Sequence, residues 1–115
     1  MPVCFVIAPD WKLRASLRAE LRERGIDALG IETADDAGHL IAQGQVPFAA
    51  VIEARSELVG DPAIQKLIER VPAILIASRT ESVPLPAVDT VLYRPVRIQE
   101  IVVRVDQLRR QGHAV

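Results

Sequence analysis

PFAAVIE, residues 47–53, is a short apolar run that ends in a single acid, Glu53. A second run, TVLYRPV at residues 90–96, contains Arg94 and Pro95 near its end. Short continuous apolar runs are typical of strands that are covered on both faces, as in a parallel sheet with helices on either side. The two runs therefore predict parallel strands, with Glu53 and Arg94 at their carboxyl ends.

Predicted strands and helices alternate along the rest of the chain. We expect strands at residues 3–7, 26–33, 48–52, 73–77 and 88–92, and helices that open at Asp10, at Asp35 or Asp36, at Asp61-Pro62 and at Arg97. The run 48–52 is the most apolar and is expected at the sheet centre, whereas 26–33 is expected near an edge. This order predicts a flavodoxin-like, doubly wound (βα)5 domain of the α/β class, with a five-stranded parallel sheet in the order 2-1-3-4-5.

The segment between the fourth and fifth strands departs from the pattern. RTESVPLPAVD, residues 79–89, contains Pro84 and Pro86, and a proline in a helix interior removes a hydrogen-bond donor and clashes with the preceding turn. We therefore expect the fourth helix to be short or missing. Apolar side chains then remain where a helix would cover the sheet, and together with the last helix they form the expected interaction face: Val83, Leu85, Val88 and Tyr93.

Length and composition limit the class of protein. The 115 residues suffice for a single domain, residues 1–115, and 14 basic residues nearly balance 15 acidic ones. This balance, with no helix suited to reading DNA, argues against direct nucleic-acid binding. One cysteine, no basic leader and no apolar run of the roughly 20 residues that span a bilayer lead us to expect a cytoplasmic protein that does not enter membranes.

The arrangement resembles the receiver domain of two-component response regulators, the CheY-like superfamily, over essentially the whole chain. In that family an acidic pair after the first strand holds magnesium, and an Asp after the third strand accepts the phosphoryl group. A Thr or Ser after the fourth strand and a Lys-Pro pair after the fifth complete the site. The resemblance implies a signal-transduction domain of a phosphorelay, fused in many cases to an output domain.

The residues at the acidic-pair positions lack the expected carboxylates. The segment DWKLRASLRAELRERG matches the receiver pattern in which Asp10 is the helix cap just after the pair, so the pair falls on Ala8 and Pro9. A shift of one residue would instead make Asp10 a metal ligand and would keep one of the two carboxylates. We expect no bound metal and no cofactor.

The other site positions are also changed. Glu53 stands at the phosphoacceptor position, where its carboxylate resembles the charge of a phosphorylated Asp more than a nucleophile. The hydroxyl position falls on Ala77 or on Ser78, and the sequence does not decide between them. Arg94-Pro95 replaces Lys-Pro, and a guanidinium is suited to bidentate pairing with a carboxylate. We expect an ion pair between Glu53 and Arg94 and, as in the family, a cis peptide bond before Pro95.

The aromatic residue that many receivers carry three positions before the Lys is replaced by Val91. Tyr93 lies two residues further on the same strand, hence on the same face, and is a partial substitute. Trp11 either packs over the altered metal site or covers the loop beside it.

Several remaining residues have ordinary interpretations. The basic stripe on the first helix, formed by Arg14, Arg18 and Arg22, is interpreted as a solvated surface rather than a dock for an acidic partner. Cys4 lies within a strand and is expected to be buried and inert. The two histidines, His39 and His113, have no second ligand at metal spacing and are expected at the surface.

These observations lead to three functional hypotheses. The first is a pseudo-receiver, a regulatory module that is not an enzyme and acts without phosphorylation by binding a protein partner, an output domain or a second copy of itself. The second is a phosphorylatable receiver. The third, a small-ligand-binding flavodoxin-like domain, is disfavoured because the loop Ala8-Pro9-Asp10 lacks the glycines that cradle a phosphate.

Overall fold

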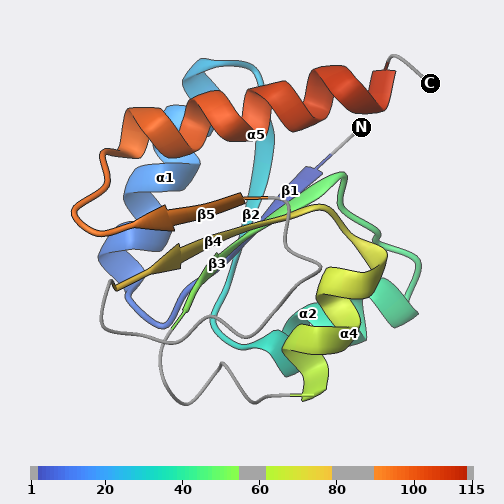
Figure 1. Cartoon of the computed structure of the whole chain (residues 1–115). Coiled ribbons are helices and arrows are strands. Elements are labelled where there is room, and N and C mark those ends of the chain that lie inside the picture. The colour runs from blue at the N-terminus through green and yellow to red at the C-terminus, as the bar shows by residue number, and fades with distance from the viewer. Residues whose placement is uncertain (1–2, 55–61, 79–89, 114–115) are drawn as a thin grey trace.

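Five parallel strands form one sheet in the computed structural model, which describes residues 3–54, 62–78 and 90–113 (Figure 1). They are β1 (Val3–Ile7), β2 (Asp27–Ile31), β3 (Ala49–Glu53), β4 (Ala73–Ala77) and β5 (Thr90–Tyr93). Their spatial order is β2-β1-β3-β4-β5. The predicted flavodoxin-like topology is therefore confirmed, with β3 at the centre and β2 at an edge.

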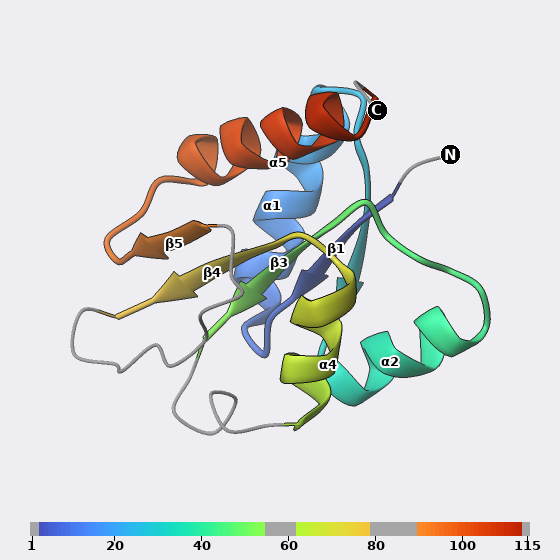
Figure 2. The same cartoon turned by 45° about the vertical axis from the view of Figure 1, so that its right-hand side comes forward.

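The described residues form four helices, two on each face of the sheet (Figures 1 and 2). The helices α1 (Trp11–Glu23) and α5 (Ile98–His113) cover one face, and α2 (Ala34–Ala42) and α4 (Pro62–Arg70) cover the other. The segment expected to have a short or missing helix, with Val83, Leu85 and Val88, lies outside the described residues. Within those residues, every helix is too short or too polar to cross a lipid bilayer.

Side chains of the central strands alternate between two apolar layers, because successive residues of a strand point to opposite faces. Phe5, Ile52 and Leu75 pack on the side of α2 and α4, whereas Val51 and Ile76 pack on the side of α1 and α5. Every residue of β3 and β4 is buried. Glu53 is two residues after Val51, so its side chain leaves the sheet on the side of α1 and α5.

The helix starts are set by side-chain caps. As predicted, Asp10 caps α1, since its carboxylate accepts a hydrogen bond from the Lys12 backbone N–H at 3.0 Å. The expected start of α2 at Asp35 or Asp36 is wrong: Thr33 is the cap, and its hydroxyl accepts from the Asp36 N–H at 3.1 Å. The two acids lie in the first turn instead, where negative charge favours the positive end of the helix dipole.

Candidate functional site

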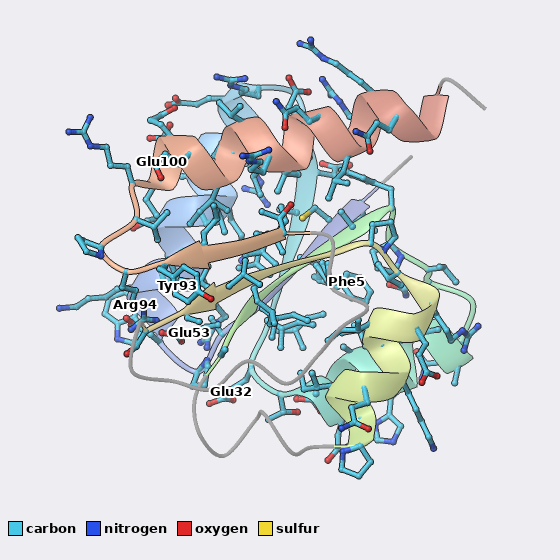
Figure 3. All side chains as sticks on the ribbon, in the orientation of Figure 1. Phe5, Glu32, Glu53, Tyr93, Arg94 and Glu100 are labelled. Carbon is cyan, nitrogen blue, oxygen red and sulfur yellow. The ribbon has the colours of Figure 1, made fainter. Side chains whose placement is uncertain are left out.

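Glu53 and Arg94 form an ion pair at the carboxyl ends of β3 and β5 (Figure 3). β4 lies between these two strands, so the ion pair reaches across the end of β4, to which neither residue belongs. The Glu53 residue is 2% exposed, whereas the Arg94 side chain is 46% exposed. The expected ion pair is confirmed, with the carboxylate inside and the guanidinium half in water.

The first loop adds a second contact to the same carboxylate. The backbone N–H of Asp10 donates a hydrogen bond to Glu53 Oε1 at 3.4 Å, while Arg94 Nη2 contacts Oε2. Both carboxylate oxygens are therefore engaged, each from a different part of the chain. A nucleophile must present an unshielded oxygen, and an engaged, buried carboxylate is poorly placed for that role.

A shallow hollow of about 540 Å³ opens at this end of the sheet, on the side of α1 and α5. Among the described residues, its polar groups are the Glu53–Arg94 pair and Asp10, and the rest of the lining is apolar. The described lining consists of Asp10, Leu13, Glu53, Ile76, Arg94, Pro95, Val96 and Ile101. The ion pair forms part of its wall, and the charges of the pair cancel each other there.

The two residues predicted at the acidic-pair positions, Ala8 and Pro9, have no side-chain group that can bind a metal. Ala8 is buried and Pro9 is exposed, and Arg14 Nη1 donates to both of their backbone carbonyl oxygens. Asp10, the alternative ligand, is engaged as the cap of α1. Among the described residues, no three His, Cys, Asp or Glu side chains group as a metal site requires. The magnesium site of the receiver family therefore does not fit these residues.

The two candidates for the hydroxyl position lie at the end of β4. Ala77 is fully buried, and its carbonyl oxygen accepts from the Arg94 backbone N–H at 2.8 Å. Its side chain packs in the layer under α2 and α4, away from Glu53. Ser78, which does carry a hydroxyl, is half-buried just beyond the strand.

The peptide bond between Arg94 and Pro95 is cis, as predicted. The neighbouring aromatic residues are largely exposed, Tyr93 at 44% and Trp11 at 64%. Neither of them lines the hollow. Trp11 is therefore not buried over the altered metal site, and Tyr93 remains the described member of the predicted interaction face.

Two groups of contacts were missed from the sequence. Arg14 and Arg18 do not form a purely solvated stripe, because Arg14 donates to the first loop and Arg18 Nε donates to the Ala28 carbonyl at 3.3 Å. On the far part of α5, buried Asp106 pairs with Arg109 at 2.6 Å, Arg110 at 3.0 Å and Arg24 at 3.6 Å. The spacing of Asp106 to Arg109 and Arg110 is a helical signal, but nothing in the sequence pattern points to Arg24.

The expected burial of Cys4 and the expected exposure of His39 are confirmed, whereas the side chain of His113 lies outside the described part of the chain. Cys4 is fully buried, and burial raises the pKa of its thiol to about 12, against a small lowering by a hydrogen bond with the Val51 backbone. His39 is exposed. Neither residue contributes to the hollow beside Glu53.

The strand order β2-β1-β3-β4-β5 is that of flavodoxin-like folds, and receiver domains are among the solved structures with the same fold. The receiver domain of Francisella response regulator 1452 superposes with a TM-score of 0.80 and 22% identity over 97% of this chain and 99% of that one. A CheY-like receiver domain protein from Methanospirillum hungatei JF-1 gives 0.77 and 15% over 100% and 99%.

A third similar structure belongs to a larger protein. It is the N-terminal domain of a response regulator/sensory box/GGDEF three-domain protein from Carboxydothermus hydrogenoformans, with a TM-score of 0.74 and 14% identity over 97% of both chains. At such identities the likeness shows the fold alone. No protein-family model matches the sequence, and no curated protein matches it either.

Proposed function

We propose that the chain is a pseudo-receiver, a regulatory interaction module that is not an enzyme and acts without accepting a phosphoryl group. One observation carries the proposal: the carboxylate at the acceptor position, Glu53, is 2% exposed and paired with Arg94. The adjoining loop supports it, since Ala8 and Pro9 offer no side-chain oxygen to a metal ion.

In this proposal the Glu53 carboxylate stands in for the negative charge that a phosphorylated Asp would carry, and Arg94 pairs with it. Two unit charges about 4 Å apart attract by roughly 4 kcal/mol at an effective dielectric constant near 20. Desolvation of Glu53 offsets much of this, and water screens the half-exposed Arg94, so the net contribution is on the order of 1 kcal/mol. That is enough to bias the ends of β3 and β5 toward one arrangement.

The partner in this proposal is a protein: an output domain, a separate protein or a second copy of the chain. The structural neighbour from Carboxydothermus hydrogenoformans is by its name the N-terminal domain of a three-domain protein, which gives a precedent for fusion. The described part of the proposed contact surface carries two exposed apolar side chains, Tyr93 at 44% and Val103 of α5 at 40%. Aromatic residues of this kind are enriched in protein interfaces.

Amide spectra of the isotopically labelled chain test the proposal. Magnesium and beryllofluoride, a mimic of the phosphoryl group, are added to this chain and to a competent receiver. We expect the competent receiver to shift at its strand ends and this chain to stay unchanged around Glu53 and Arg94. Saturable shifts at Glu53, Ala54 and Arg94 would favour the alternative function, a phosphorylatable receiver, which rests on the shared fold.

A further inference from the structure

A groove of about 470 Å³ lies between α2 and α4, on the opposite face of the sheet from the Glu53–Arg94 pair. Figures 1 and 2 both show these two helices side by side under the sheet. The groove is lined by Asp35, Gly38, His39, Ile41, Pro62, Ala63, Lys66, Leu67 and Arg70. Its volume falls within the roughly 300–1,000 Å³ that is typical of small-molecule sites.

The floor of the groove is apolar and the rim is charged. Ile41 and Leu67 belong to the core and are 7% and 4% exposed, and half-buried Ala63 packs beside them. Lys66 and Arg70 lie one helical turn apart on α4 and both line the groove. This combination of an apolar floor with a few convergent polar groups is characteristic of ligand sites.

The charges on the rim do not neutralise one another. Among the described residues of the lining, Asp35 is the one acid, whereas Lys66 and Arg70 are both basic, and the neighbouring acids Asp36 and Glu69 are not part of the lining. Within the described residues, Lys66 and Arg70 make no ion pair and no side-chain hydrogen bond. The described part of the groove therefore presents an available ammonium and an available guanidinium group against a single carboxylate.

Gly38 lines the groove on α2 and has no side chain that would take up space in it. Glycine inside a helix costs roughly 1 kcal/mol relative to alanine, and it is usually explained by a positive φ or by close packing. Gly38 has neither reason: its φ is not positive, and a Cβ built there would meet no atom of the described residues within 4 Å apart from the backbone of its own helix and its chain neighbours. Because Gly38 lines the groove, a large side chain at this position would take up room in it.

We propose that this groove is a binding site for a small organic anion, a carboxylate or phosphate carried on an apolar body. The apolar body would lie on Ile41 and Leu67, and the anionic group would bind Lys66 and Arg70. The proposal goes beyond the regulatory function above and does not depend on it, since the groove and the ion pair lie on opposite faces of the sheet.

The test is a fluorescence titration of the whole chain with 1-anilinonaphthalene-8-sulfonate, an organic anion with an aromatic body, accompanied by amide spectra. Two changes target the groove: Gly38→Leu fills it, and Lys66→Gln with Arg70→Gln removes its charge. Lys12→Gln with Arg104→Gln removes the same charge from exposed positions elsewhere and is the matched control. Leucine favours helix over glycine, so Gly38→Leu is expected to fold, which thermal unfolding verifies.

We expect the anilinonaphthalene sulfonate probe to bind the natural chain saturably, with amide shifts centred on α2 and α4. Each groove change should weaken binding by about tenfold or more, while the control stays within about twofold. Binding that is unsaturable, or that survives both groove changes, would overturn the proposal. Displacement of the probe by acidic amphipathic peptides but by no small carboxylate or phosphate would also overturn it, because the groove would then belong to a protein segment.

Discussion

Glu53 and Arg94 contact each other across the end of β4, joining the central strand β3 to the edge strand β5. The contact exists only when three strands are assembled in register, with Glu53 opposite Ile76 and Ala77 opposite Tyr93. The same carboxylate also accepts from the Asp10 N–H in the first loop. A single buried carboxylate thus connects the three chain segments at the carboxyl ends of β1, β3 and β5.

Replacing Glu53 by Gln is expected to lower the free energy of unfolding by about 1 kcal/mol. Gln retains an acceptor for the Asp10 N–H but loses the charge that Arg94 faces, and Arg94, being half exposed, is then rehydrated. Urea denaturation measures the change. Glu32→Gln, which neutralises an exposed acid just after β2, is the control and should change the free energy by less than about 0.5 kcal/mol. Equal effects of the two variants would show that the pair does not stabilise the strand ends.

Shortening Glu53 to Asp should not by itself create a phosphorylation site. The substitution would restore the side chain that the family uses, but Ala8 and Pro9 would still provide no ligand for magnesium, and Arg14 would still occupy their carbonyl oxygens. Mass spectrometry of the Glu53→Asp variant after treatment with acetyl phosphate and magnesium should show the unmodified mass. A phosphoryl adduct in this variant would mean that the first loop binds the metal without the acidic pair.

The sequence predicted strand bounds best where a proline directly precedes a continuous apolar run. Pro72 precedes an unbroken apolar run, and β4 occupies residues 73–77 as expected. Thr33 was missed as the cap of α2 because three polar residues there, Thr33, Asp35 and Asp36, are all competent caps, and only the three-dimensional start of the helix selects one.

The sequence predicted the contact of the site that follows from the strand topology. It did not predict the contacts that long side chains make with other parts of the chain. Glu53 and Arg94 meet because carboxyl ends of parallel strands share one edge of the sheet. The contacts of Arg14 with the first loop and of Arg24 with Asp106 depend on the rotamers that let these long side chains fold back over the surface. No periodicity in the sequence encodes that choice of rotamer.

Asp106→Asn is expected to destabilise the packing of α1 on α5 by about 1–2 kcal/mol. Its buried carboxylate holds Arg109 and Arg110 of its own helix and Arg24 at the end of α1, and the amide would leave their charges unbalanced. Thermal or urea unfolding checks the prediction. Glu100→Gln is the matched control, because Glu100 is exposed on the same helix. If the two variants have the same free energy of unfolding, the cluster around Asp106 contributes no more to stability than an exposed surface charge does.

Cys4 should resist thiol reagents in the folded chain. Burial raises the pKa of the thiol from 9.0 to about 12, so the reactive thiolate is scarce at pH 8 and the sulfur is also inaccessible. Labelling with iodoacetamide should therefore proceed only through unfolding, with a rate that rises with urea. Rapid labelling without denaturant would contradict the buried position of β1.

The same thiol predicts a loss of stability in alkali. Because the pKa in the folded chain is raised, the neutral thiol contributes fully below pH 9.0, and this contribution declines as the pH rises toward about 12. Cys4→Ala lacks the titrating group, so its unfolding free energy should fall less steeply over this range. If the unfolding free energies of the natural chain and of Cys4→Ala fall in parallel with pH, the thiol is not responsible for the loss of stability.

Intact-mass spectrometry after incubation with acetyl phosphate and magnesium tests the central claim most directly, with a competent receiver treated in parallel. We predict that the competent receiver gains a phosphoryl group and that this chain keeps its unmodified mass, because Glu53 is buried against Arg94 and the predicted metal-binding positions, Ala8 and Pro9, carry no carboxylate. A phosphoryl adduct on this chain, mapped to Glu53 or Asp10, would contradict the claim that it acts without phosphorylation.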